Sequence, residues 1–327
     1  MFSIGIDLGG TNVAAAVVSE EGEILSRSSI PTPKKWGSEL PQQVAEAMVE
    51  ASFLALEGTA FSFGEASSVG IGTPGTVDPT TQTIGLWSNM DFHDVPLGKL
   101  YTEAAKKRSD VVPKVYLEND ANAAALGEFF AGAGKNGDSL VAVTLGTGVG
   151  GGAIFNGKLF TGFNYAGMEI GHFVLKAGGR PCSCGRKGCF EAYSSATALI
   201  SRTKEMMEQN TSSKLWEIAS SLDKVNGKTA FDAALLGDET GLAVVDEYIY
   251  YLASGVTSLI NLFQPEILCI GGGVAGQKDK LITPLLKIVD NEDYARGLDH
   301  RTRVVVAELG NDAGIIGAGM LWKFSDN

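Results

Sequence analysis

The feature that most constrains the fold of this chain is a pattern that occurs twice. An apolar run, a turn of glycine and threonine and a second apolar run occupy residues 7–18 (DLGGTNVAAAVV) and again residues 144–155 (TLGTGVGGGAIF). Apolar runs of this length interrupted by glycine are typical of strands joined by tight turns. The sequence therefore predicts two similar half-molecules, each built on a strand, a turn and a second strand.

The segments that follow each copy indicate a mixed α/β fold. Three strands of an antiparallel meander are predicted at 2–6, 13–18 and 23–30. Residues 39–56 show helical spacing, and a strand then ends in GTPG at 72–75. After residue 111, KVYLEND predicts a strand and ANAAALGEFFAGAG predicts a helix. The pattern of the first half thus recurs in the second.

The remainder of the chain completes the second half. Residues 198–262 are mostly helical in pattern, strands are predicted at 266–274 and 303–309, and a helix closes the chain. We place the domain boundary near 114–117. The expected domains are therefore a small one of residues 1–116, completed by the C-terminal helix 312–327, and a larger one of residues 117–311.

Composition excludes several classes of partner. The net charge is -12 and no basic run occurs, so neither nucleic acid nor an anionic membrane is an expected partner. We recognise no signal peptide and no apolar run long enough to cross a bilayer, which favours the cytoplasm. In that reducing compartment, clustered cysteines are more often metal ligands than disulfides.

The glycine turns are candidate phosphate-binding loops. Glycine lets backbone amides turn toward an anion, and threonine adds a hydroxyl donor. Asp7 in DLGGT can hold Mg²⁺ or its waters beside a phosphate. One isolated turn of this kind is more simply a tight hairpin, but two matched turns and GGGV at 271–274 favour nucleotide binding. The chain has no GxxxxGK[ST] motif, and GTGVGG at 146–151 joins strand to strand, unlike a dinucleotide-binding turn.

Asp120 in YLENDANAAALGE is the candidate catalytic base. It lies where a buried strand ends and a helix begins, which is where open α/β sheets carry their chemistry. A helix N-cap is an equally good interpretation, since aspartate and asparagine both favour that position, and Asn119 and Asn122 flank it. If the loops hold ATP, an aspartate can accept the proton of the attacking hydroxyl.

Three of the four cysteines lie in one short segment with a histidine. His172, Cys182, Cys184 and Cys189 form the pattern H-x9-C-x-C-x4-C, which is the ligand set of a tetrahedral structural zinc site. A C-x-C disulfide would be strained, and three cysteines would leave one unpaired; inert buried thiols are the remaining alternative. Four protein ligands leave no position for a zinc-bound water, which argues against hydrolysis by this metal.

Two carboxylates flank this segment and suggest a polyhydroxylated ligand. Glu169 lies three residues before His172, and Glu191 lies two residues after Cys189. A metal-bound histidine can still donate from its second ring nitrogen. Several acceptors beside one donor suit a sugar, because each hydroxyl both donates and accepts. Taken separately, each glutamate reads as surface charge.

These motifs together resemble the ROK family (repressor, open reading frame, kinase). The resemblance is carried by DLGGTN at 7–12, GTPG at 72–75, ENDANAAALGE at 118–128, LGTGVGGG at 145–152, EIGH at 169–172 and CSCGRKGCFE at 182–191. It extends in order from residue 4 to about residue 319. The closing segment reads GNDAGIIGAG, with Asn311, where the family pattern has GDxAGxxGAA, which leaves the nucleotide preference open.

The resemblance implies a fold and the roles of particular residues. The fold would be the two-domain actin-like ATPase (ribonuclease H-like) fold with a cleft between the domains, and the reaction would be ATP-dependent phosphorylation of a hexose. Asp120 would be the base, and the sugar contacts would be Gly75, Asn89, Asn119, Asp120, Glu169, His172 and Glu191. Phosphates and Mg²⁺ would lie at Asp7, Gly9, Gly10, Thr11, Asn12, Gly146, Thr147 and Gly148. Adenosine would lie between Gly271, Gly272 and Gly273 and the AGIIGAG turn.

The leading hypothesis is a zinc-stabilised kinase that converts glucose and ATP into glucose 6-phosphate and ADP, as in glycolysis. Fructose, mannose, N-acetylglucosamine and N-acetylmannosamine are alternative acceptors. A sugar sensor without turnover is a second hypothesis, although such a protein has no need of Asp120. A polyphosphate-using kinase would need a basic groove, which the net charge of -12 does not favour. The family also implies a homodimer or a dimer of dimers.

Overall fold

The chain forms two compact units. The structure is a computed structural model that describes residues 1–34, 37, 39–87 and 90–324. The first unit comprises Met1–Leu140, Gly152–Met168 and Glu308–Asn327, and the second comprises Val141–Gly151 and Glu169–Ala307. By this grouping residues 117–140 belong with the first unit. The expected domain boundary between residues 116 and 117 stays a prediction.

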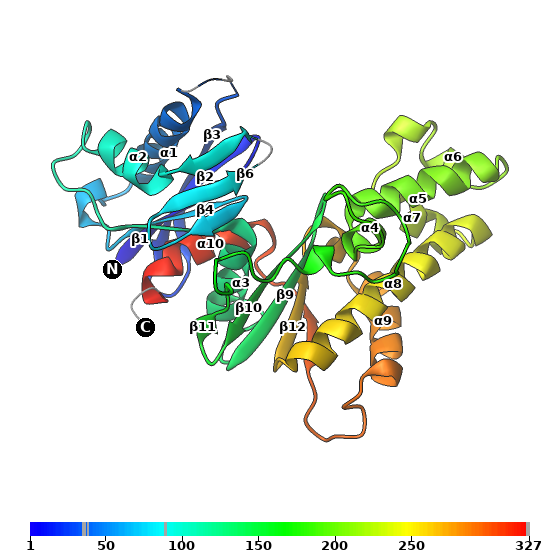
Figure 1. Ribbon diagram of the computed structural model, residues 1–327. Helices are drawn as coiled ribbons and strands as arrows, with labels where there is room; N and C mark the ends of the chain where they lie inside the picture. Colours follow the sequence, from blue (N-terminus) through cyan, green and yellow to red (C-terminus); the bar gives the residue numbers. More distant parts are fainter. Residues whose placement is uncertain (35–36, 38, 88–89, 325–327) are drawn as a thin grey trace. The chain divides into compact units, whose positions relative to one another are not determined.

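The first unit is built on a five-stranded sheet in the order β3-β2-β1-β4-β8 (Figure 1). Its strands are β1 (Phe2–Leu8), β2 (Asn12–Ser19), β3 (Ile24–Pro31), β4 (Val69–Thr73) and β8 (Val115–Asn119). The first three strands form an antiparallel meander, and β4 and β8 continue the sheet from β1 in parallel. The predicted meander, the strand before GTPG and the strand in KVYLEND are confirmed.

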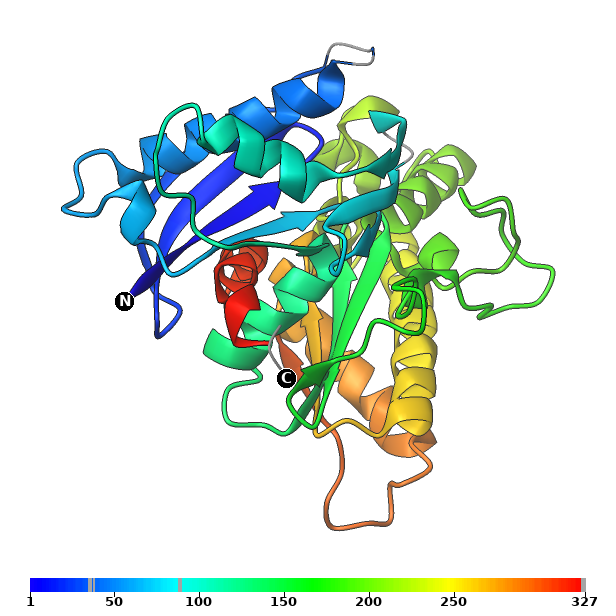
Figure 2. The ribbon, with the colours of Figure 1, turned by 60° about the vertical axis from the view of Figure 1, so that its left-hand side comes forward.

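Helices cover both faces of this sheet. The helices are α1 (Leu40–Leu56), α2 (Leu97–Ala105), α3 (Asp120–Ala131) and α10 (Ala313–Met320). Figures 1 and 2 both show α1 and α2 on one face, and α3 beside α10 on the other. Side chains alternate along β1: Ile4 and Ile6 join the core with α1, whereas the Ser3 hydroxyl donates to the Gly319 carbonyl of α10 at 2.6 Å.

Glycine lets α10 approach the sheet closely. A Cβ on Gly5 of β1 would overlap the carbonyl oxygen of Ile315, and a Cβ on Gly70 of β4 would overlap that of Ala318. The closing helix can therefore pack with its backbone directly against the backbone of the sheet, which its small residues and these sheet glycines permit.

A second five-stranded sheet has the order β11-β10-β9-β12-β13. Its strands are β9 (Ser139–Leu145), β10 (Val149–Phe155), β11 (Lys158–Leu159), β12 (Ile267–Gly271) and β13 (Arg303–Val306). This order repeats that of the first sheet strand for strand, which confirms the predicted repeat. A small third sheet, order β5-β6-β7, comprises β5 (Thr76–Asp78), β6 (Thr83–Trp87) and β7 (Phe92–Val95).

The second unit also carries the predicted helical segment. Its helices are α4 (Glu191–Ser194), α5 (Ala196–Gln209), α6 (Leu215–Ile218), α7 (Thr229–Leu235), α8 (Glu239–Phe263) and α9 (Asp279–Glu292). The Asp238 carboxylate caps α8 by accepting from the Gly241 N–H at 2.7 Å. Among the residues described, none of the helices has the length and apolar character needed to span a membrane.

Candidate active site

Three parallel strands of the first unit end at the same edge of their sheet, and acidic residues gather there. Asp7 of β1 pairs with Gly72 of β4, and Gly72 pairs with Glu118 of β8. Asp120 follows directly, as the first residue of α3. Because parallel strands present their carboxyl ends together, this edge is where an α/β sheet places chemical groups.

Asn119, not Asp120, caps helix α3. The Asn119 side-chain oxygen accepts from the backbone N–H groups of Ala121 at 2.9 Å and Asn122 at 3.2 Å. Asp120 accepts from the Ala121 N–H at 2.8 Å and is largely buried. Burial raises the pKa of the Asp120 carboxyl above its ordinary value, against hydrogen bonds that lower it. The capping role that the sequence left open between these neighbours thus falls to Asn119.

Asn119, an expected sugar contact, is hydrogen-bonded to a second one, Gly75. Its side-chain amide donates to the Gly75 carbonyl at 3.0 Å. Gly75 has φ +95°, and a Cβ there would overlap the backbone of Leu86, so only glycine fits this turn after β4. The third expected contact of this region, Asn89, lies outside the described residues.

Asp7 has the electrostatic character of a cation ligand. Burial, together with the charge of Asp120, raises the pKa of the Asp7 carboxyl from 3.8 to about 6. The turn that follows is exposed at Gly10, Thr11 and Asn12. Its base is closed by the Gly9 N–H, which donates to the Asn12 carbonyl at 2.9 Å. A cation beside Asp7 would favour the charged carboxylate that burial disfavours.

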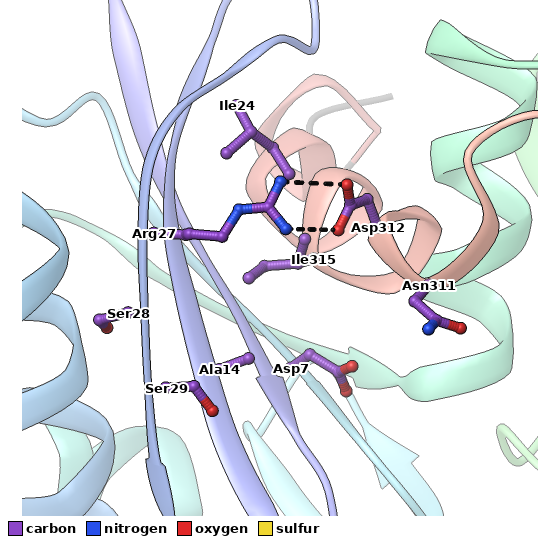
Figure 3. Close-up of a pocket in the computed structure, with 9 residues that line it drawn as sticks. All are labelled: Asp7, Ala14, Ile24, Arg27, Ser28, Ser29, Asn311, Asp312 and Ile315. Atoms are coloured by element: carbon purple, nitrogen blue, oxygen red, sulfur yellow. Dashed lines mark hydrogen bonds and ion pairs between the residues drawn. The ribbon is translucent and has the colours of Figure 1, made fainter.

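A cavity of about 290 Å³ adjoins Asp7 in the first unit (Figure 3). Arg27 of β3 and Asp312, just before α10, form a two-pronged ion pair in its wall, with distances of 3.1 and 3.2 Å. Asn311, the residue that departs from the family pattern, lines the same cavity. The pairing of Arg27 with Asp312 was not predicted, because the two residues are 285 positions apart.

Two buried glutamates near this edge were also missed. Glu118 accepts from the Asn119 N–H and from the Asn122 side chain, each at 2.9 Å, and so fixes the start of α3. Glu128, at the end of the ENDANAAALGE motif, accepts from the backbone N–H groups of Glu308 at 3.1 Å and Leu309 at 2.8 Å. A glutamate in an otherwise alanine-rich helix was the available signal for this second anchor.

In the second unit the two remaining glycine turns lie together. The Gly146 N–H donates to the Gly148 carbonyl at 3.0 Å, which forms the turn after β9 that includes Thr147. At the end of β12, Gly272 has φ +86°, and a Cβ there would lie 2.6 Å from the Leu145 backbone nitrogen. The 146–148 and 271–273 turns, both predicted to contact the nucleotide, therefore lie beside each other in the second unit.

The four predicted metal ligands converge. The donor atoms of His172, Cys182, Cys184 and Cys189 all lie within 4.8 Å of one another. Cys184 Sγ and Cys189 Sγ are 3.7 Å apart, and Cys182 Sγ lies 3.7 Å from His172 Nδ1. Zinc-sulfur bonds of about 2.3 Å in a tetrahedron give sulfur-sulfur separations of about 3.8 Å. The donor set therefore fits a closed four-coordinate zinc site, and Nδ1 is the His172 ring nitrogen that lies beside Cys182 Sγ.

Residues 172–189, which carry the four predicted metal ligands, are called the cysteine loop below. Glu191 links this loop to a glycine turn. One carboxylate oxygen accepts from the Val149 N–H at 3.0 Å, directly after the 146–148 turn. The other accepts from the Ser183 hydroxyl at 3.1 Å. Glu169 is exposed, and its carbonyl accepts from the His172 N–H at 3.0 Å. Glu169, His172 and Glu191 are therefore held on one loop system of the second unit.

Comparison with known proteins finds relatives along nearly the whole chain. The sequence model of the ROK family matches residues 3–325. A glucokinase of Thermotoga maritima is 41% identical over 323 residues, which cover 98% of this chain and 96% of the relative.

Solved structures also match along nearly the whole chain. One is a ROK family glucokinase of Streptomyces griseus in complex with glucose and AMPPNP, with TM-score 0.80, 34% identity and coverage of 98% of this chain and 99% of that one. Another is a ROK hexokinase of Thermus thermophilus, with TM-score 0.80, 31% identity and full coverage of both chains. The expected α/β class and actin-like ATPase fold are confirmed. The chain belongs to the ROK family.

Proposed function

We propose that this protein is an ATP-dependent glucokinase, which converts glucose and ATP into glucose 6-phosphate and ADP. The observation that carries the proposal is the partly buried carboxylate of Asp120 directly after a parallel strand, with the capping role taken by Asn119. Relatives named glucokinase along nearly the whole chain support glucose as the acceptor.

Asp120 serves as the general base. Phosphoryl transfer to an alcohol requires a group that accepts the hydroxyl proton. Burial raises the pKa of Asp120, and a higher pKa makes its carboxylate a stronger base. We infer that Asp120 accepts the proton of the 6-hydroxyl of glucose as that oxygen bonds to phosphorus.

The family resemblance assigns nucleotide contacts to residues of each copy of the strand-turn-strand pattern. Asp7 fits Mg²⁺ or its waters, because a cation would offset the burial and the Asp120 charge that together raise the pKa of its carboxyl to about 6. When bound, Mg²⁺ neutralises the phosphate charge that develops during transfer. The amides of 9–12 and 146–148 would contact the phosphates, and those of 271–273 would approach adenosine.

The cysteine loop would hold structural Zn²⁺ through His172, Cys182, Cys184 and Cys189. A closed ligand shell supplies folding energy rather than a reactive water. With Nδ1 toward the metal, Nε2 of His172 is free to donate to a sugar hydroxyl. Glu169 and Glu191 then supply acceptors on the same loop system. The family resemblance assigns further sugar contacts to Gly75, Asn89 and Asn119.

A coupled ADP-release assay with MgATP across glucose, fructose, mannose, N-acetylglucosamine and N-acetylmannosamine tests the assignment. The proposal expects glucose to give the highest kcat/KM and no ADP release without sugar. A higher kcat/KM with another sugar would reassign the acceptor. Binding of a sugar without ADP release would contradict the kinase assignment and favour a sensor.

We also infer a homodimer or a dimer of dimers, and a cytoplasmic role in glycolysis, from the family resemblance. Light scattering on the zinc-loaded protein measures the first. A monomer at micromolar concentration would contradict it.

A further inference from the structure

In the second unit, ion pairs and aromatic side chains join the cysteine loop to neighbouring helices through residues that are not metal ligands. Lys176 and Arg180 extend from the stretch between His172 and Cys182. Their partners lie on helices: Glu247 and Tyr251 on α8, and Tyr193 on α4. Glu247 and Tyr251 are four residues apart and therefore share one face of α8.

Glu247 is the centre of this cluster. One carboxylate oxygen accepts from the Arg180 guanidinium, and the other accepts from Arg202 Nε of α5 at 2.9 Å. The three side chains are only 28–31% exposed. Arg202 also donates to Glu205 at 3.0 Å, a contact within α5. Glu247 is the residue that joins Arg180 of the loop to Arg202 of α5. Charge-assisted hydrogen bonds at such partly buried sites are stronger than those of exposed pairs.

The backbone of the loop is fixed at the same place. The Arg180 N–H donates to the Tyr193 hydroxyl at 2.8 Å, and the Arg180 guanidinium lies 4.7 Å from the centroid of the Tyr193 ring. Lys176 Nζ donates to the Tyr251 hydroxyl at 3.2 Å. The Gly188 N–H donates to the Arg180 carbonyl at 2.7 Å, which connects this stretch to the residue before Cys189. A shift at Arg180 would therefore be transmitted to both sides of the metal-ligand cluster.

We infer that Glu247 is a positioning residue for the cysteine loop: through Arg180 and Arg202 it holds the loop on α5 and α8, so that the metal ligands and the sugar-facing His172 are preorganised. This inference rests on the proposed function for its effect on sugar, but not for its effect on zinc. Preorganised ligands release a metal more slowly, because fewer loop conformations compete with the bound one.

The test measures zinc release from the zinc-loaded full-length protein with a chelating indicator. We expect Glu247→Gln and Arg180→Met each to release zinc about three- to tenfold faster, the size of one partly screened charged hydrogen bond. The double variant should release zinc no faster than the faster single variant, because both remove the same contact. Glu205→Gln, which removes the other partner of Arg202 and leaves the loop contact in place, should stay within twofold of the wild type.

Sugar kinetics provide the second readout. In Glu247→Gln we expect the glucose KM to rise at least threefold while kcat and the ATP KM change less than twofold. Wild-type zinc-release rates in both Glu247→Gln and Arg180→Met, additive effects in the double variant, or a lower melting temperature with unchanged zinc release would each overturn the inference. If Glu247→Gln does not fold, the zinc-release rate of Arg180→Met is compared with that of Lys187→Met, which changes an exposed residue of the same loop. A wild-type protein that holds zinc but phosphorylates no sugar would refute the proposed function while the zinc readout still tests Glu247.

Discussion

The two sheets of this protein have the same strand order but different chemistry at their strand ends. In the first, Asp7, Glu118 and Asp120 stand at the ends of β1 and β8 or directly after them. In the second, the corresponding strands end in Leu145 and Val306, and the residues that directly follow them, Gly146 and Ala307, are uncharged. Its charged and metal-ligating groups lie instead on the cysteine loop. A duplicated frame therefore does not require duplicated function.

The fourth strand in the order of each sheet shows what the copies retain. β4 and β12 are both followed by a glycine with positive φ, Gly75 at +95° and Gly272 at +86°. At each, a Cβ would overlap neighbouring backbone. The backbone turn is common to both copies, whereas its proposed ligand differs: a sugar near Gly75 and a nucleotide near Gly272.

Apart from loss of the proposed base itself, the largest effect on this contrast is expected from Asp7→Asn. Loss of the proposed Mg²⁺ ligand should lower kcat by about a hundredfold or more. The same change should stabilise the fold at pH 7.5, because the charged carboxylate is buried at a cost. The difference between a pKa of about 6 and the ordinary 3.8 corresponds to on the order of 3 kcal/mol.

The sign follows from proton binding. Between about pH 4 and pH 6 the native state holds a proton on Asp7 that the unfolded state has lost, so this group lowers the free energy of unfolding as pH rises through that window. Urea unfolding at pH 4 and pH 7.5 measures it. The stability gain of Asp7→Asn should be present at pH 7.5 and nearly absent at pH 4. An equal gain at both pH values would show that burial of charge is not its cause.

A smaller effect is expected at the glycine with positive φ that follows β4 in one copy, Gly75, and β12 in the other, Gly272. Gly272→Ala should destabilise the protein by about 1–3 kcal/mol and raise the ATP KM, since alanine is strained at φ +86° and meets the Leu145 backbone. Gly75→Ala should instead raise the glucose KM. Gly276→Ala is the control, because its Cβ would meet no atom within 4 Å. If Gly272→Ala behaved like Gly276→Ala in chemical denaturation and ATP kinetics, the close approach of the two glycine turns would be wrong.

The smallest effect is expected from Arg27→Met. The Arg27 side chain is 62% exposed, so its ion pair with Asp312 should contribute less than about 1 kcal/mol to stability. We expect kcat to stay within twofold of the wild-type value. A tenfold loss of kcat would show that the cavity beside Asp7 takes part in the reaction.

Local patterns allowed much of this fold to be predicted from sequence. Apolar runs and glycine turns predict the strands, and the spacing of His172, Cys182, Cys184 and Cys189 predicts a cluster that the structure closes to within 4.8 Å. Contacts between distant segments leave no such local pattern. Glu128 meets Glu308 and Leu309 across about 180 residues, and Arg180 meets Glu247 across 67.

The start of α3 shows a second limit. Asn119 and Asp120 both favour a helix N-cap by residue type, and sequence cannot separate them. The backbone geometry does: Asn119 is extended at φ -62°, ψ 145°, and its side chain accepts two N–H groups, while Asp120 is already helical. The assignment of cap and proposed base therefore depends on the exact residue at which β8 ends.

The central claim is that Asp120 carries the catalytic step, whereas the zinc-bound cysteine loop helps to position the sugar. Steady-state ADP release with MgATP and glucose, compared among the wild type, Asp120→Asn and Cys184→Ser, tests it most directly. We predict that Asp120→Asn lowers kcat about a thousandfold with little change in glucose affinity, since a general base contributes roughly 10²–10⁴. Cys184→Ser should lose zinc and raise the glucose KM at least tenfold with a much smaller loss of kcat. A near-normal kcat in Asp120→Asn, or the same kinetic parameter lost in both variants, would contradict the account.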